Sequence, residues 1–202
     1  CPSSDLFEGA DAVINLAGEN IASGLWTSSR KEKILRSRIN AVRRLTESLM
    51  KTRSKPSVFI SASAIGIYGD RGDEPLTENS SPGDGFLAEV CRKWEEEVSR
   101  IRDLGIRTVS LRFGMVLGHD GGAMNMMLPP FRMGLGGPMG NGTQWMSWIH
   151  VEDAARLIVH ALETSSLEGV VNAVAPHPAT NKEFSKALGT VLNRPAFLPA
   201  PS

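Results

Sequence analysis

Two short apolar runs, AVINLAG at residues 12–18 and VFISAS at residues 58–63, decide the fold class. Each run ends in small residues, which is the pattern of a strand buried on both faces. Between them, apolar residues recur every three or four positions, as on one face of a helix: Leu35, Ile39, Val42, Leu45 and Leu49. A strand, a helix and a strand within roughly 50 residues predict a right-handed parallel unit.

Strands and helices continue to alternate after residue 63. A second helical stripe is formed by Leu87, Val90, Trp94, Val98 and Ile101. It is followed by a predicted strand at 108–113, a helix at 151–162 and a strand at 170–174. The alternation predicts an α/β fold, a Rossmann-like parallel sheet flanked by helices, whose ligands bind beyond the carboxyl ends of the strands.

Two helix starts are predicted from the capping-box spacing, a Ser or Thr followed three residues later by Glu. Ser29 and Glu32 have this spacing before the first helical stripe. Thr180 and Glu183 have it before a last helix that runs through Leu192.

Regular alternation stops between residues 114 and 142, where glycine, proline and methionine dominate. Linkers are usually more polar, so we interpret this segment as a small substrate lobe; an ordinary surface loop with packed methionines is the alternative. The predicted organisation is a partial nucleotide-binding domain at 1–122, a Met/Gly-rich excursion at 123–150, and returning elements of the sheet with part of the C-terminal lobe at 151–202.

Composition excludes several classes of protein. Lys plus Arg and Asp plus Glu number 22 each, so no global field steers the chain toward nucleic acid or an anionic membrane. Two cysteines cannot build a disulfide framework, and no apolar run approaches the roughly 20 residues that span a bilayer. The four histidines are scattered, which predicts no metal site. A cytoplasmic location is expected.

Four segments at predicted strand ends resemble, in this order, the NAD-dependent epimerase/dehydratase family of extended short-chain dehydrogenases/reductases. They are VINLAG at 13–18, SASAIGIYGD at 61–70, LRFGMVLG at 111–118 and WIHVEDAAR at 148–156. GENIASGLWT at 18–27 and GLGGPMGNGTQWMSWIHVED at 134–153 are similar to an atypical subgroup labelled nucleoside-diphosphate-sugar epimerases.

The resemblance implies a bound NAD or NADP, with NADP preferred. The cofactor-binding residues it implies are Leu16, Ala17, Gly18, Glu19, Asn40, Ser61, Ala62, Arg112, Gly114, Met115 and Val116. Small residues at 17 and 18 would let a ribose and diphosphate lie against the backbone, although close strand-to-helix packing also explains them. Asn40 is a sheet-edge residue near the cofactor or a solvated helix residue. Backbone amides of the segment 114–116 are expected to face the carboxamide.

The resemblance also places candidate catalytic residues. Ser63 matches the serine or threonine that binds the reacting substrate oxygen; its hydroxyl can donate or accept a hydrogen bond, and capping of the strand end is the alternative. Tyr68 is the second catalytic candidate, and Trp145 and His150 are expected beside the substrate.

The sequence departs from the family at the proton-transfer pair, a tyrosine followed four residues later by a lysine. The tyrosine position holds Phe86 or Leu87, and the lysine position Val90 or Cys91. Glu89, Lys93, Tyr68 and His150 remain as substitutes, while Cys91 is interpreted as a buried hydrophobe. A cofactor-binding regulatory protein or sensor without turnover therefore competes with an enzyme acting on a small polar substrate.

A second departure concerns the glycine-rich turn that binds pyrophosphate, which in the family precedes VINLAG by two or three strands. The sequence does not contain it, so the N-terminal strands that carry it are expected to be absent, and cofactor binding to be weak. GLGGPMGNG is not that turn, because it follows no clear strand and opens no helix.

Partners beyond the substrate are weighed from charge and from the resemblance. Ten Lys and Arg against two Glu between residues 30 and 55 raise a nucleic-acid alternative, but the solvated face of an amphipathic helix is the ordinary explanation. Neither nucleic acid nor membrane is expected. The resemblance implies a homodimer through helices around Ala41 and Glu95.

Overall fold

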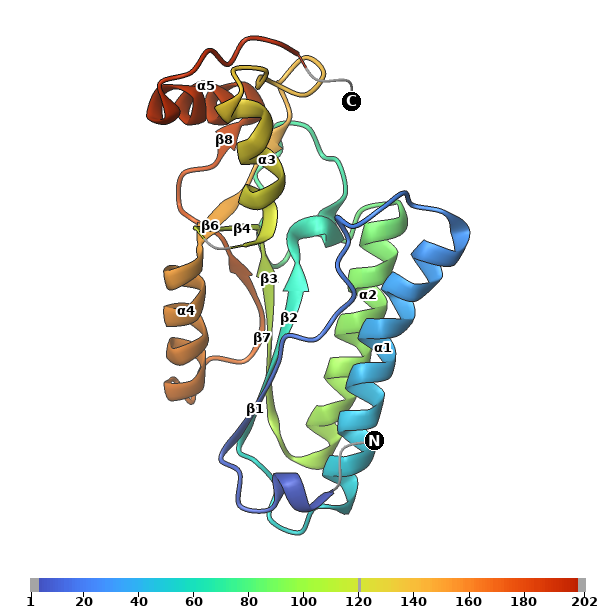
Figure 1. Cartoon of the computed structure of the whole chain (residues 1–202). Coiled ribbons are helices and arrows are strands. Elements are labelled where there is room, and N and C mark those ends of the chain that lie inside the picture. The colour runs from blue at the N-terminus through green and yellow to red at the C-terminus, as the bar shows by residue number, and fades with distance from the viewer. Residues whose placement is uncertain (1–3, 120, 200–202) are drawn as a thin grey trace. The chain divides into compact units, whose positions relative to one another are not determined.

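A computed structural model describes residues 4–119 and 121–199 (Figure 1). Its main sheet is parallel and has the strand order β1-β2-β3-β7, which confirms the predicted Rossmann-like α/β fold. The four strands are β1 (Ala12–Asn15), β2 (Val58–Ala64), β3 (Arg107–Phe113) and β7 (Gly169–Ala173). Ala12 lies opposite Val58 and Asn15 opposite Ser61, so the carboxyl ends of β1 and β2 meet at one edge.

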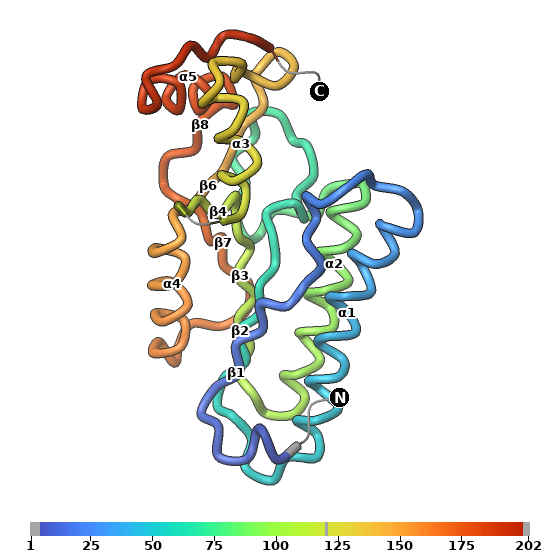
Figure 2. The backbone as a smooth tube through the Cα atoms, in the orientation of Figure 1, coloured from blue at the N-terminus to red at the C-terminus, as the bar shows by residue number. Residues whose placement is uncertain are grey.

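Helices cover both faces of this sheet. Two helices, α1 (Ser28–Lys51) and α2 (Phe86–Ser99), run side by side along one face, and α4 (Val151–Glu163) lies on the other (Figures 1 and 2). Short 3-10 turns complete the connections: η1 (Ser4–Phe7), η2 (Ile65–Tyr68) and η3 (Arg100–Leu104). No helix among the described residues is both long and apolar enough to cross a membrane.

The start of α1 differs from the prediction. Thr27, not Ser29, is its N-cap, and the Thr27 hydroxyl accepts a hydrogen bond from the Arg30 amide. The helix begins earlier because a threonine in extended conformation already satisfies a free first-turn amide. Glu32 instead pairs with Arg36 one turn further along.

The core between sheet and helices combines residues of both predicted helical stripes with residues of the strands and their connections. The buried cluster includes Val42, Leu49, Phe59, Trp94, Val98 and Ile101. Burying each such side chain contributes about 1.5–3 kcal/mol. The core therefore fixes both helices against β2, and with them the polar side chains that α2 directs at the end of that strand.

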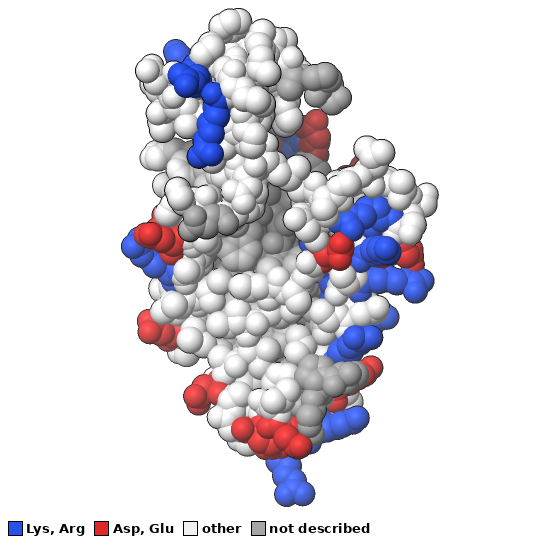
Figure 3. Space-filling model, in the orientation of Figure 1, with Lys and Arg blue, Asp and Glu red and all other residues white. Residues whose placement is uncertain are grey.

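Most lysines and arginines of α1 stand on its exposed side (Figure 3), whereas Arg30 and Arg38 are partly buried. Arg36 pairs with Glu32, and Arg43 pairs at 2.5 Å with Glu97 of α2. This is the arrangement of a solvated helix face with local ion pairs.

The chain forms two compact units. The first comprises Cys1–Arg71, Leu76–Arg112 and Arg156–Asn172, and the second Gly72–Pro75, Phe113–Ala155 and Ala173–Ser202. Most of the main sheet belongs to the first unit, while β3 and β7 each contribute their last residue to the second.

The second unit contains the Met/Gly-rich segment, and part of that segment is helical. In this unit β4 (Met115–Gly118) pairs in parallel with β6 (Trp148–His150), and β5 (Trp145–Met146) pairs antiparallel with β8 (Ala179–Thr180). The helices are α3 (Gly122–Arg132) and α5 (Asn181–Leu192). The capping box of Thr180 and Glu183 is present at the start of α5, as predicted. The sequence interpretation missed α3, because Pro129 and Pro130 lie inside it.

Candidate functional site

The carboxyl ends of β1 and β2 are joined by Asn15. Its Nδ2 donates to the Ser61 hydroxyl at 3.3 Å, and its Oδ1 accepts from the Ala17 amide at 3.3 Å. Asn15 and Ser61 are buried, whereas Leu16, Ala17 and Gly18 are exposed. A buried amide thus holds the turn after β1 in shape and leaves its backbone accessible to a ligand.

Gly18 lies against the guanidinium of Arg38 from α1. A Cβ added at Gly18 would come within 3.0 Å of Arg38 Cζ. Arg38 is held in place by Nη1 bonds of 3.1 Å to the carbonyls of Glu19 and Ile34, and by stacking 5.2 Å from the Trp94 ring. Desolvation by burial lowers the pKa of Arg38. Contact with the Arg38 guanidinium thus favours a residue without a side chain at position 18.

A second arginine of α1, Arg30, organises the loop that follows Gly18. It forms a 2.5 Å ion pair with Glu19 and donates to the Asn20 carbonyl and the Ser23 hydroxyl. The positive charge of Arg30 thereby offsets the negative charge of Glu19, next to the exposed backbone of residues 16–18. Asn40, further along α1, is exposed.

The end of β2 carries a polar group that we call the Arg112 cluster: Ser63, Tyr68 and Arg112 are buried in it, Glu95 and Asn172 are partly buried, and Glu78 is exposed. Arg112 and Glu95 form a two-pronged ion pair, with Nε to Oε1 at 2.9 Å and Nη2 to Oε2 at 2.8 Å. The Ser63 hydroxyl lies 2.6 Å from Glu95 Oε1. The side chains of Arg112 and Glu95 are 7% and 12% exposed, so water screens the pair little. The hydrogen bond to Glu95 raises the pKa of Arg112 further above its ordinary value.

Tyr68 belongs to the same cluster. Arg112 Nη1 donates to the Tyr68 hydroxyl at 2.8 Å, and that hydroxyl donates to Asn172 Oδ1 at 2.6 Å. Asn172 is held in turn by its backbone amide, which donates to Glu78 Oε1 at 2.8 Å. Tyr68 is buried, and its single hydrogen is already engaged. The tyrosine is thus built into the support of Arg112.

One face of α2 is directed at the end of β2. Leu87 packs on Gly66, Cys91 packs with Ile67 and Tyr68, and Glu95 binds Ser63. These helix residues are spaced by four, so Leu87 and Cys91, two of the residues considered for the tyrosine and lysine positions, lie on one face of α2. Neither side chain can exchange a proton near neutral pH, because Leu87 has no ionisable group and burial raises the pKa of the Cys91 thiol to about 11. Cys91 is therefore a buried neutral thiol.

Two of the other substitutes lie on the surface of α2. Glu89 and Lys93 form an ion pair at 2.5 Å, with side chains 49% and 38% exposed. The hydrogen bond from Lys93 lowers the pKa of Glu89. The two residues lie one helical turn apart, and each offsets the charge of the other.

The remaining predicted residues belong to the second unit. The amides of Gly114 and Met115 donate to the carbonyls of Ala173 and Ser147, so they are not free to face a carboxamide as expected. Val116 pairs with Ile149 in the strand ladder. Gly114 is required by crowding, since a Cβ there would come within 2.6 Å of the Ser147 oxygen.

The two expected substrate residues of this unit differ in their surroundings. Trp145 is half-exposed and donates from Nε1 to Asp73 at 2.7 Å. His150 is exposed, and its Nδ1 accepts from the Glu152 amide at 3.3 Å, as in a turn. Both side chains are largely accessible to solvent.

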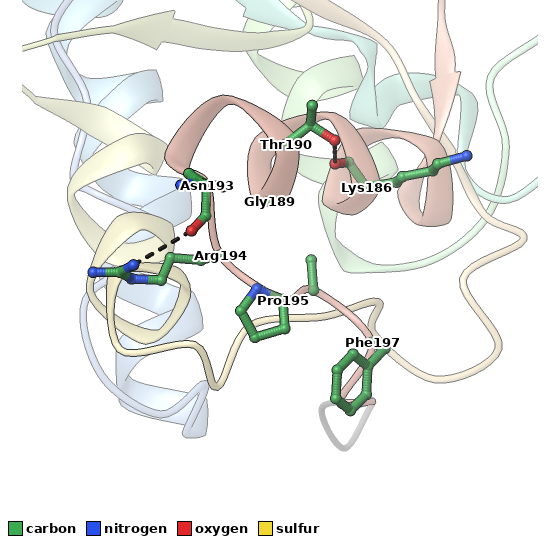
Figure 4. A pocket seen from close by; sticks show the side chains of 8 residues that line it. Lys186, Gly189, Thr190, Asn193, Arg194, Pro195 and Phe197 are labelled. Carbon is green, nitrogen blue, oxygen red and sulfur yellow. Dashed lines mark hydrogen bonds between the residues drawn. The ribbon is translucent and has the colours of Figure 1, made fainter.

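The described residues line several hollows, two of which lie beside helices α5 and α2. One, of about 560 Å³, lies in the second unit beneath the end of α5, between Lys186 and the segment Arg194 to Phe197 (Figure 4). Its Thr190 and Arg194 donate to backbone carbonyls, and no predicted site residue lines it. The other, of about 550 Å³, lies in the first unit beside Phe86 and the start of α2. Within the described ranges no group of three or more His, Cys, Asp or Glu could hold a metal ion.

Sequence reasoning placed Ser61 and Ser63 at the end of one strand, Tyr68 in the segment after it and Arg112 at the end of another strand, but did not predict the side chains that join them. Glu95 was missed because it sits in the run Glu95–Glu97, which has the appearance of a solvated helix face. Its spacing of eight residues from Leu87 and four from Cys91 was the available signal. Asn15, Arg38 and Asn172 carried no recognisable spacing.

Relatives of this chain are named for epimerases. Epimerase family protein YfhF of Bacillus subtilis is 45% identical over 192 residues, which are 95% of this chain and 63% of YfhF. Human epimerase family protein SDR39U1 is 40% identical over 195 residues, which are 95% of this chain and 66% of the human protein. The chain thus spans about two thirds of the length of these relatives.

Solved structures give the same fold. A crystal structure of human SDR39U1 (isoform 2) with NADPH matches with a TM-score of 0.90 and 39% identity, over 95% of this chain and 66% of that chain. UDP-glucuronic acid 4-epimerase of Bacillus cereus, in complex with UDP-glucuronic acid and NAD, matches with a TM-score of 0.85 over 100% of this chain and 65% of that one. At 20% identity this second likeness concerns the fold alone.

A model of the NAD dependent epimerase/dehydratase family matches residues 4–173, most of the chain. The sheet order, the strand-end segments and these relatives agree with that match. This chain belongs to the NAD-dependent epimerase/dehydratase family, with the fold of an extended short-chain dehydrogenase/reductase.

Proposed function

We propose that this protein binds NADP(H), or less favourably NAD(H), beyond the carboxyl ends of β1 and β2 and transfers hydride to or from a small polar substrate held at Ser63. The main support for this proposal is the Ser63 hydroxyl, which the ion pair of Glu95 and Arg112 holds at the end of β2. The human relative crystallised with NADPH supports the choice of cofactor.

The residues after β1 suit a dinucleotide. Leu16, Ala17 and Gly18 expose their backbone, and Arg30 offsets the charge of Glu19 next to them. Ser61 and Ala62 would form the neighbouring wall at the end of β2. The nicotinamide ring would supply or accept the hydride, while the protein orients the substrate oxygen through Ser63.

A cofactor-binding sensor without turnover is the second candidate. The observation that favours it is that Leu87 and Cys91, which share the face of α2 directed at the end of β2, cannot exchange a proton near neutral pH. An enzyme of this kind would need a proton route other than that of its family.

Titration of NADPH fluorescence tests the first half of the proposal. We expect the fluorescence to change in a saturable way, and the change to persist in a Ser63→Ala variant, which keeps the Glu95–Arg112 pair. No saturable change, in this chain or in one extended to the length of its relatives, would refute cofactor binding.

Turnover tests the second half. Wild-type protein is incubated with NADPH and with NADP⁺ against a panel of nucleotide sugars and small ketones and alcohols, and nicotinamide absorbance is followed. We expect turnover that Ser63→Ala lowers by at least a factor of about 100, as expected for a lost acid–base or orienting contact. Binding without turnover would support the sensor.

A further inference from the structure

Glu95 determines which hydrogen-bonding group Ser63 can offer to a ligand. Both Glu95 oxygens accept from Arg112, and a carboxylate paired in this way is ionised. An ionised carboxylate has no hydrogen to give. At 2.6 Å from Glu95 Oε1, the Ser63 hydroxyl must therefore be the donor, and its single hydrogen points at Glu95.

Only the lone pairs of the Ser63 oxygen remain available to a ligand. In the part of the chain that the structure describes, no other group donates to Ser63 Oγ, whereas the hydroxyl hydrogen is fully used. A ligand group that meets this oxygen must bring its own hydrogen. We infer that Glu95 is a positioning residue that makes Ser63 a hydrogen-bond acceptor, so that the group bound there is an alcohol rather than a carbonyl.

The arrangement is held from several sides. Arg112 donates to the Tyr68 hydroxyl at 2.8 Å and to the Glu78 carbonyl at 3.3 Å, so it cannot swing away without leaving these acceptors unsatisfied. Glu95 is fixed in turn by both prongs of Arg112. Turning the Ser63 hydrogen toward a carbonyl ligand would abandon its charge-assisted hydrogen bond to Glu95.

The inference rests on the proposed function, because it takes Ser63 as the group that touches substrate. Its test uses two probes of the size of a sugar ring, cyclohexanol and cyclohexanone, which differ in whether the oxygen carries hydrogen. Saturation-transfer NMR measures their binding to this chain with and without NADP⁺. NADPH titration on the same samples reports separately on cofactor binding.

We expect cyclohexanol to be preferred over cyclohexanone by about 3- to 10-fold, the range of one hydrogen bond. Ser63→Ala should bring the ratio of cyclohexanol to cyclohexanone affinity to about one, whereas Ser63→Thr, which keeps a hydroxyl, should retain the wild-type ratio. Glu95→Gln should narrow it, since one amide oxygen cannot serve Ser63 and both prongs of Arg112. Glu97→Gln is the matched control: Glu97 is a buried, arginine-paired glutamate of the same helix that does not touch Ser63, and the ratio should stay as in the wild type.

A merely structural role of Glu95 would weaken both probes alike and leave their ratio unchanged. Equal binding of the two probes, a preference for the ketone, or a preference that survives Ser63→Ala would overturn the inference. Binding of neither probe while NADPH binds normally would also overturn it. Failure of NADPH titration alone would reject the cofactor proposal and leave the probe ratio to decide the role of Glu95.

Discussion

The end of β2 in the first unit and the segment after β3 in the second both carry predicted ligand contacts, but they are built differently. At the end of β2, charged and hydroxyl side chains are buried together and satisfy one another. After β3, the backbone of Gly114 and Met115 is fastened to neighbouring carbonyls, and the side chains expected to contact substrate, Trp145 and His150, are exposed. The first region is held together by buried charges, and the second is constrained by close packing of its backbone. Loss of a charge should therefore destabilise the first, and an added side-chain atom the second.

The largest effect is expected where charge is buried. Replacing Arg112 by leucine leaves Glu95 ionised without its partner, and we expect a loss of about 3–5 kcal/mol in the free energy of unfolding. Urea denaturation followed by circular dichroism measures it. Arg43→Leu is the control, because Glu97 keeps Arg100 as a partner and Arg43 is half-exposed; its loss of unfolding free energy should be much smaller than that of Arg112→Leu. Equal losses would contradict the special status of the Arg112 cluster.

A smaller effect is expected where space is short. Gly114→Ala places a Cβ 2.6 Å from the Ser147 oxygen, and the strain should lower the unfolding free energy by about 1–3 kcal/mol. Gly121→Ala serves for comparison, since its backbone is extended and no atom lies within 4 Å of the added carbon. Thermal unfolding of both variants should separate them; if Gly114→Ala were as stable as Gly121→Ala, the segment after β3 would not be limited by space.

The capping box of α5 offers a test within the second unit alone. Thr180→Ala removes the hydroxyl that accepts from the Glu183 amide, and we expect thermal unfolding to show a loss of about 1 kcal/mol in the free energy of unfolding.

The same capping box makes the stability depend on pH. The pKa of Glu183 is lowered chiefly by its hydrogen bond from the Thr180 backbone amide, so the stabilisation by Glu183 is present above its unfolded pKa and is lost as pH falls through its folded pKa. Thermal scans across acidic pH should therefore show a smaller decline for Glu183→Gln than for the wild type.

The subtlest effect concerns Cys91 and appears only in alkali. The folded pKa of the thiol, about 11, lies above its ordinary value of 9.0, so the folded state holds the proton more tightly. The resulting stabilisation is complete below pH 9 and is lost as pH rises through about 11. The difference in unfolding free energy between wild type and Cys91→Ala should shrink over that range. A constant difference would mean that the thiol is not buried in the folded protein.

Much of the fold follows from periodicity, because helix and strand repeats are local properties of the chain. The stripe containing Val42 and Leu49 and the run at 58–63 both appear where predicted. The start of α1 and the presence of α3 were missed, since several polar residues can cap a helix and prolines disguise one. At the site, Ser63 and Arg112 were found through strand ends and family resemblance. Glu95 was not, because its inward direction depends on how α2 packs against β2.

The consecutive glutamates of α2 show how different the demands on one residue type can be. A helix turns by about 100° per residue, so neighbouring identical letters face different surroundings. Glu95 meets Ser63 and Arg112, Glu96 meets Arg100 near solvent, and Glu97 meets Arg43. Aspartate at 95 would be one methylene too short to reach both partners, while position 96 should accept almost any helix former. In a saturation mutagenesis library, three adjacent codons with the same wild-type residue should therefore give three unlike tolerance profiles, strictest at 95 and most permissive at 96.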